Sequence, residues 1–267
     1  MRTLDAAFLM ACGILPVVSC TDTIGQEQSS KTHDGGVNEE DTRRTDKVLI
    51  PGGWFLMGCR EGDIDCKTNE VPAHRVFVRD FYIDRYEVTV EKYKKCVVGG
   101  GCSPIRAGDE CTMAMIDNES LPVNCVNWHQ AQDFCAWAKS RLPTEAEWEK
   151  AATYRLDDAE MPNYRVIAWY GETSDGCPHR VGTKKPTAGG LYDMVGNVGE
   201  WCSDWYDEEY YKVSPEENPQ GPLKGRGRVI RGGSFNDRPG AGARITARIG
   251  NFSDSGHEDD GFRCASD

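Results

Sequence analysis

The sequence predicts an α+β domain with little regular secondary structure, cross-linked by disulfides, in which loops carry much of the mass. Only two segments show clear helical periodicity, and the strand-like segments are short and separated by long stretches rich in glycine, of which the chain has 29. Loops of such length need covalent support, and the 12 cysteines can provide it. With 267 residues, the chain is long enough to bury a substantial core.

The first 19 residues are predicted to be a processing signal. Arg2 gives a weakly positive start, Ala6 to Val18 is apolar, and Val17-Val18-Ser19-Cys20 resembles the cleavage site of a bacterial lipoprotein, in which Cys20 carries the lipid. An ordinary secretory peptide cleaved nearby is the alternative. Both interpretations export the chain, and the lipidated form would be anchored to a membrane without spanning it.

Residues 20–46 are predicted to form a disordered tether, because they are rich in polar residues and contain almost no apolar ones. The folded domain is expected to span residues 47–267. A formal net charge of −12 disfavours nucleic-acid binding, which needs a basic face. Beyond the N-terminus there is no apolar run of about 18 residues, so no membrane-spanning helix is expected.

The first part of the domain is predicted to contain two strands and a short helix. Residues 48–57 read as a strand with a Gly-Gly break, and residues 76–83 read as a second strand with imperfect alternation. The helix is expected to begin at Thr89, whose hydroxyl can accept a hydrogen bond from a free amide of the first turn.

Two further helices are predicted from capping residues and apolar periodicity. Asn127 with Gln130 can cap the first, and Thr144 with Glu147 forms a capping box for the second. The inward stripes of the two helices are Trp128, Ala131, Phe134, Cys135 and Ala138, and then Trp148 and Ala151. Arg141, between the two helices, is interpreted as a buried anchor for a carboxylate.

Ten cysteines are left for disulfides if Cys12 is removed with the signal and Cys20 carries the lipid. The even number in an exported chain indicates disulfides, although sequence alone cannot choose among the possible pairings. Local spacing favours Cys59–Cys66 and Cys96–Cys102, with Cys111–Cys125 and Cys177–Cys202 as weaker candidates. Zinc is not expected, because no Cys-x2-Cys pair exists and the five histidines are scattered.

The segment Gly190–Trp201 places glycines, an amide and two carboxylates within twelve residues. Glycine lets backbone carbonyls turn inward, and Asp193 and Glu200 offer hard oxygen ligands on either side of such a turn. Carbonyl and carboxylate oxygens together are what calcium requires. A Gly-Asn turn between two buried aromatic segments is the alternative.

This segment and six other blocks occur in the order typical of one known family. The blocks are Ile50–Gly58, Glu70–His74, Phe81–Thr89, Arg141–Glu149, Arg231–Ser234 and Gly261–Cys264. Together they resemble the formylglycine-generating enzymes, also called sulfatase-modifying factors. The resemblance implies an irregular, C-type-lectin-like fold for residues 47–267.

The resemblance also implies roles for individual residues. A disulfide would join Cys135 on a helix to Cys264 in the C-terminal Gly-Phe-Arg-Cys block. A structural calcium would be bound by two carboxylates and two backbone carbonyls, those of Asp193, Glu200, Gly196 and Val198.

Enzymes of this family oxidise a cysteine of a sulfatase to formylglycine, using oxygen and copper held by two cysteines shortly after the Gly-Gly-Ser block. Thiolates suit Cu(I), because soft ligands select soft metals. In this chain residues 233–248 contain no cysteine, and Gly242 and Ala247 stand where the thiols are expected. Copper is therefore not expected.

The sequence as a whole predicts an exported lipoprotein of the cell envelope, periplasmic or at the surface. Its sulfatase-modifying-factor-like domain would be a non-catalytic binding or scaffold module, with a protein, peptide or glycan as ligand. The alternative is an oxidoreductase that modifies a protein side chain, with an activity of the formylglycine-generating oxidase type.

Overall fold

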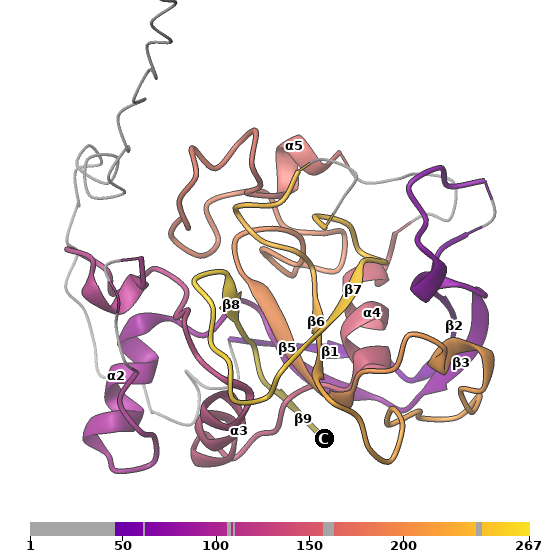
Figure 1. Ribbon diagram of the computed structural model, residues 1–267, viewed down its shortest axis with the longest axis horizontal. Coiled ribbons are helices and arrows are strands. Elements are labelled where there is room, and N and C mark those ends of the chain that lie inside the picture. Colours follow the sequence, from indigo (N-terminus) through magenta and orange to yellow (C-terminus); the bar gives the residue numbers. More distant parts are fainter. Residues whose placement is uncertain (1–45, 61, 106–107, 109, 157–162, 239–241) are drawn as a thin grey trace, which may run out of the picture.

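The computed structural model describes residues 46–60, 62–105, 108, 110–156, 163–238 and 242–267 (Figure 1). The predicted signal peptide, Cys20 and the tether up to residue 45 lie outside the described residues. No helix in the described ranges is both long and apolar enough to cross a membrane. Helices and strands are few and short, which confirms the predicted α+β class with little regular structure.

The strands form three small sheets. One sheet has the order β7-β6-β5-β8, with the strands Arg248–Asn251, Arg228–Arg231, Gly199–Trp205 and Asp260–Gly261. A second has the order β1-β4-β9, with the strands Lys47–Ile50, Phe81–Asp84 and Ala265–Ser266. The third pairs β2 (Gly53–Met57) with β3 (His74–Val78). All of these pairings are antiparallel except that of β5 with β8, which is parallel.

Residues 76–83 contain two strands, so the prediction of a single strand there is wrong. β3 ends at Val78, β4 begins at Phe81, and the two strands belong to different sheets. Arg79 and Asp80 make the turn between them, and a Cβ added to Gly52 would lie 2.9 Å from the backbone nitrogen of Asp80. Apolar alternation gave no sign of this turn, because hydrophobic residues continue on both sides of it.

The three predicted helices are present with their predicted caps. The α-helices are α2 (Val90–Val98), α3 (Trp128–Trp137), α4 (Glu145–Thr153) and the short α5 (Tyr164–Ile167). Short 3-10 helices are η1 (Thr68–Glu70), η2 (Thr112–Ala114) and η3 (Tyr210–Lys212). Thr89 accepts a hydrogen bond from the first turn of α2, and Asn127 and Thr144 open complete capping boxes. α5 was not predicted, because four residues are too few to show a helical period.

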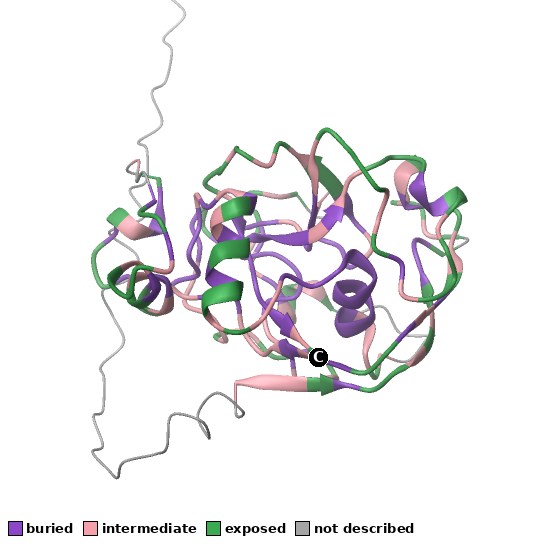
Figure 2. Cartoon of the chain, turned by 90° about the horizontal axis from the view of Figure 1, so that it is seen from below, coloured by how far each residue is buried: buried purple, intermediate pink, exposed green. Residues whose placement is uncertain are grey.

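α4 is the central helix of the domain and is buried almost along its whole length (Figure 2). Trp148 and Ala151, which the sequence places inside, are fully buried. Two acidic residues, Glu145 and Glu149, are buried with them. Because buried charges are costly unless paired, these carboxylates require partners from other elements.

Arginines from β6 and β7 provide those partners. Arg231 donates to Oε1 of Glu145 at 2.7 Å and to Oε2 of Glu149 at 2.5 Å. Arg248 donates to both oxygens of Glu145, at 2.6 and 2.8 Å. Burial by itself would raise the pKa of Glu145, but Arg248 and Arg231 outweigh burial and lower this pKa to about 2. We call Glu145, Glu149, Arg231 and Arg248 the α4 ion-pair network.

Four disulfides join cysteines of the described residues: Cys59–Cys66, Cys96–Cys102, Cys111–Cys125 and Cys135–Cys264. The last joins residues 129 apart, a span whose closure stabilises a fold by roughly 4–5 kcal/mol in the chain-entropy description. The suggested pairing of Cys177 with Cys202 is wrong, because Cys202 is a free thiol. Cys202 lies on β5 and faces the core, a direction that sequence spacing alone does not reveal.

Replacing Arg231 with methionine should lower the free energy of unfolding by about 3–5 kcal/mol, because the substitution leaves buried carboxylates without their partner. Urea unfolding of the variant measures the loss. Arg165→Met is the matched control, since Arg165 pairs with Glu172 and both side chains are substantially exposed. That control should cost less than about 1 kcal/mol. Equal losses in the two variants would show that the α4 ion-pair network does not have the structural role described here.

Candidate functional site

The segment Gly190–Trp201 forms a tight turn whose backbone depends on glycine. Positive φ angles occur at Gly190 (82°), Asp193 (55°), Gly196 (75°) and Asn197 (58°). A Cβ added to Gly196 would lie 2.1 Å from the carbonyl oxygen of Trp169, so no larger residue fits there without a shift of the backbone. The chain therefore approaches itself closely at this turn.

Four successive amides of the turn have fixed acceptors. The amide of Gly196 donates to Gly232 O, and that of Asn197 donates to Trp169 O. The amide of Val198 donates to Glu87 Oε1, and that of Gly199 donates to Asp259 O. In a trans peptide unit the N–H and the C=O point in opposite directions. The bonds of Asn197 and Gly199 therefore also fix the carbonyl directions of Gly196 and Val198, the two carbonyls implied as calcium ligands.

Glu200, one of the two implied carboxylate ligands, already accepts three hydrogen bonds. Arg263 donates to both of its oxygens at 2.7 Å, and Trp148 Nε1 donates to Oε2, also at 2.7 Å. All three side chains are fully buried. Glu200 is thus the ion-pair partner of the arginine in the Gly-Phe-Arg-Cys block, and only Oε1 keeps a lone pair for a further partner.

Asp193, the other implied carboxylate ligand, has one oxygen without a partner. Oδ2 accepts a hydrogen bond from Gly182 N at 2.7 Å, whereas the buried Oδ1 has no hydrogen bond within the described part of the chain. Burial raises the pKa of Asp193 to about 6, against the opposing effects of the Gly182 amide and Arg263. A buried acceptor without a donor is where a cation would be most favourable.

Glu87 is a third carboxylate at the turn, and sequence reasoning missed it. Its oxygens accept hydrogen bonds from Asn197 Nδ2 at 2.6 Å and from Val198 N at 3.1 Å. Burial raises the pKa of Glu87 well above its usual value, and the charges of Asp193 and Glu200 raise it further. Glu87 is separated from Asn197 by 110 residues, so no local spacing could have connected the two.

The three carboxylates of Glu87, Asp193 and Glu200 share one buried cation, Arg263. A hard divalent cation would balance the excess negative charge. Asp193 Oδ1 is an oxygen that could accept calcium, whereas Glu200 would have to be shared with Arg263. The donor set of the turn is therefore compatible with calcium and also contains an ion pair.

A second candidate site is a cavity of about 120 Å³ around Ser234. Its lining residues are Lys67, Gly199, Ile230, Gly233, Ser234, Asp237, Gly242, Ala247, Arg248, Ile249, Asp259 and Asp260. Gly242 and Ala247, the positions at which the resemblance places thiols, are both among them. These described lining residues include neither a cysteine nor a histidine, so the cavity offers acidic oxygens in place of soft ligands.

Asp237 fills the space over Gly242. Its Oδ2 accepts hydrogen bonds from N and Oγ of Ser234, at 2.7 and 3.3 Å. A Cβ added to Gly242 would lie 2.1 Å from Oδ1 of Asp237, so a side chain at this position would have to displace the carboxylate. Asp260 also lines the cavity. Its burial, together with the charge of Asp259, raises its pKa to about 7.

Arg244 does not line this cavity, although it lies between Gly242 and Ala247 in the sequence. It is buried and donates to both oxygens of Glu70, at 3.0 and 2.5 Å, which fastens the loop to η1. Ser234 is held in a tight turn after Gly232 and Gly233, which have φ angles of 88° and 67°. This turn and the hydrogen bonds to Asp237 give Ser234 a structural role.

Comparisons with known proteins show what this chain is similar to. Residues 34–267 match the family described as "Sulfatase-modifying factor enzyme 1-like domain". The chain is 32% identical to the "Formylglycine-generating enzyme" of Streptomyces coelicolor, over 83% of this chain and 89% of that one. It is 30% identical to the "Inactive C-alpha-formylglycine-generating enzyme 2" of Mus musculus, over 82% and 85%. The structure of PvdO from Pseudomonas aeruginosa shares the fold, with a TM-score of 0.71, 24% identity, and coverage of 83% and 94%.

Proposed function

Since the chain belongs to the sulfatase-modifying factor family, we propose that it is an exported, lipid-anchored member whose domain binds a peptide, protein or glycan and does not generate formylglycine. The domain keeps the family's shape and has lost its redox centre. Its binding surface includes the acidic cavity around Ser234. The rival function is an oxidase that modifies a protein side chain.

One observation carries this proposal. The cavity at Gly242 and Ala247 contains a carboxylate in the space that a side chain at position 242 would need. Copper(I) prefers thiolates, and carboxylates suit hard cations instead. Because the sequence of residues 233–248 supplies no sulfur, the ligands for the family's copper are missing from this region.

The degree of identity to relatives does not decide between the two functions. A relative at 32% identity is named an enzyme, and another at 30% is named inactive. The side chains at the cavity are therefore the stronger argument. They favour a domain in which the scaffold has been kept for recognition.

The purified protein should neither bind Cu(I) stoichiometrically nor convert a sulfatase-derived thiol peptide to an aldehyde. Competition with a Cu(I) chelator measures the first, and oxygen uptake with chemical capture of the aldehyde measures the second. The Streptomyces coelicolor enzyme, assayed in parallel, shows that each assay works. Tight 1:1 copper binding together with aldehyde formation would establish the oxidase function and exclude ours.

We also propose that the turn at Asp193 binds a structural calcium ion, for which the unpartnered Asp193 Oδ1 and the excess of carboxylates are the support. Asp193, Glu200 and the carbonyls of Gly196 and Val198 would hold the ion, which would supply positive charge among the carboxylates. Glu87 would hold the turn through Asn197 and Val198, and Arg263 would hold it through Glu200.

Calcium should raise the melting temperature of the wild-type protein, and Asp193→Asn should remove most of that increase, because the amide cannot supply the same charge. Differential scanning calorimetry with calcium and with a chelator measures both effects. Asp254→Asn is the control, since its side chain is 91% exposed and contacts His129 instead of a residue of the turn. A calcium-dependent increase that survives Asp193→Asn would place the ion elsewhere.

The proposal of export rests on the apolar segment Ala6–Val18 and on Cys20. In a bacterial host the full chain should fractionate with membranes and incorporate a fatty acid label. Cys20→Ser should lose the label and move the protein to the soluble envelope fraction, because no acyl anchor remains. A Cys20→Ser protein that stays in the membrane with its label would exclude lipidation at this residue.

A further inference from the structure

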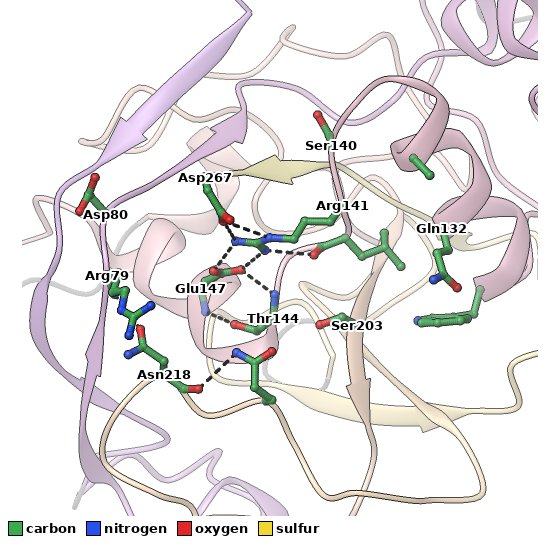
Figure 3. Close-up of a pocket in the computed structure, with 14 residues that line it drawn as sticks. Arg79, Asp80, Gln132, Ser140, Arg141, Thr144, Glu147, Ser203, Asn218 and Asp267 are labelled. Carbon is green, nitrogen blue, oxygen red and sulfur yellow. Dashed lines mark hydrogen bonds and ion pairs between the residues drawn. The ribbon is translucent and has the colours of Figure 1, made fainter.

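A cavity of about 600 Å³ lies on another part of the molecule and shares no lining residue with the cavity around Ser234 (Figure 3). The second half of α3, the α3–α4 connection, the β3–β4 turn and the loop after η3 surround it. Its lining residues are Arg79, Asp80, Trp128, Gln132, Ala136, Ser140, Arg141, Leu142, Thr144, Glu147, Ser203, Asn218, Gln220 and Asp267. A volume of this order accommodates a small organic molecule or one to two residues of a polymer.

Arg141 is the central cation of this cavity, and one edge of its guanidinium is fully used. Nη1 and Nη2 donate to the two oxygens of Glu147 at 2.7 and 2.8 Å, a bidentate pair. Oε2 of Glu147 also accepts from Thr144 N within the capping box of α4. The helix therefore fixes the plane and the direction of the guanidinium.

The other edge of Arg141 is only half used, and its partner Asp267 also lines the cavity. Nε and Nη2 both point to the same oxygen of Asp267, Oδ1, at 3.3 and 2.7 Å (Figure 3). The Asp267 side chain is 91% exposed, and that of Arg141 is 38% exposed. An ion pair this exposed contributes at most about 1 kcal/mol. A guanidinium edge that could bind two oxygens thus holds one oxygen of a weakly held side chain.

We propose that this cavity binds a ligand through a carboxylate, which replaces Asp267 on the Nε/Nη2 edge of Arg141. A ligand carboxylate can place one oxygen on each donor, whereas Asp267 offers the same oxygen to both. The exchange also preserves the charge balance, because one carboxylate leaves as another enters. Asp267 acts as an internal competitor that lowers the affinity.

The surroundings of Arg141 fit the rest of such a ligand. Arg79 and Asp80 lie together at one side of the cavity and add one positive and one negative charge to its lining (Figure 3). The guanidinium of Arg79 has no hydrogen bond or ion pair within the described ranges, and the side chains of Gln132 and Gln220 offer uncharged donors and acceptors. The ligand is therefore expected to carry a carboxylate for Arg141 and neutral polar groups for the two glutamines.

Two matched pairs of small probes test this inference on the full chain by ligand-observed NMR titration. The first pair is N-acetylglutamic acid N-methylamide and its glutamine analogue, and the second is glucuronate and glucose. In at least one pair, the acid should bind at least tenfold more tightly than its neutral partner, because only the acid can form the bidentate contact. The pair in which the acid binds more tightly than its neutral analogue shows whether the carboxylate of the ligand belongs to a peptide side chain or to an acidic sugar.

Two variants connect the binding to Arg141. Asp267→Ala should tighten binding of the acid by up to about fivefold, the equivalent of an exposed ion pair of about 1 kcal/mol. Arg141→Lys should weaken it at least tenfold, since an ammonium cannot bind two oxygens in the same plane. Asp254→Ala removes an aspartate of equal exposure outside the cavity and should change nothing. Asp267→Ala leaves the Arg141–Glu147 pair intact, so its result does not depend on how Arg141→Lys folds.

Four outcomes would overturn the inference. They are no detectable binding of either acid, equal binding of acid and neutral analogue in both pairs, unchanged affinity in Asp267→Ala, and unchanged affinity in Arg141→Lys. A tighter complex in Asp267→Ala together with a weaker one in Arg141→Lys would assign the carboxylate to the Nε/Nη2 edge.

Discussion

The fold depends on the pairing of buried glutamates with buried arginines. Short strands and long loops cannot be held by backbone ladders alone, so contacts between distant segments must supply the specificity. Glu145 provides the clearest case, because its carboxylate binds arginines of both β6 and β7 and thereby connects the central helix to the sheet. A buried ion pair of this kind adds little stability compared with apolar packing, but breaking it is expensive. It therefore selects one arrangement of the loops over the others.

The same arrangement recurs at two other points, and each joins blocks that lie far apart in the sequence. Glu70 of η1 binds Arg244, and Glu200 of β5 binds Arg263. Cys264, the residue after Arg263, forms the disulfide to Cys135. An ion pair and a disulfide at adjacent residues therefore both attach the C-terminal segment to the domain. The turn at Asp193 departs from this rule of balanced charge, since the charges of Glu87, Asp193 and Glu200 all act on Arg263. This departure is the basis of the calcium site that we propose there.

Local chemistry in the sequence was enough to predict α2, α3 and α4, because an N-terminal cap is complete within four residues. It was not enough for residues 76–83, where Arg79 and Asp80 divide a continuous apolar pattern between two strands. The family resemblance supplied what spacing could not, including the Cys135–Cys264 disulfide across 129 residues. The sequence did not predict the role of Glu87 or the pairing of Glu200 with Arg263. A contact between residues far apart in the sequence does not change the pattern of the residues that flank either partner.

The cavity around Ser234 shows how this part of the fold is held in place. Its walls are set by backbone geometry, since Gly232 and Gly233 adopt left-handed conformations and a Cβ on Gly233 would lie 2.5 Å from the carbonyl carbon of Gly242. Asp237 then ties Ser234 through two hydrogen bonds, and Arg231, just before the glycines, belongs to the α4 ion-pair network. None of these contacts involves sulfur. The shape of this turn therefore depends on backbone geometry, on Asp237 and on the α4 ion-pair network, and not on thiols at positions 242 and 247.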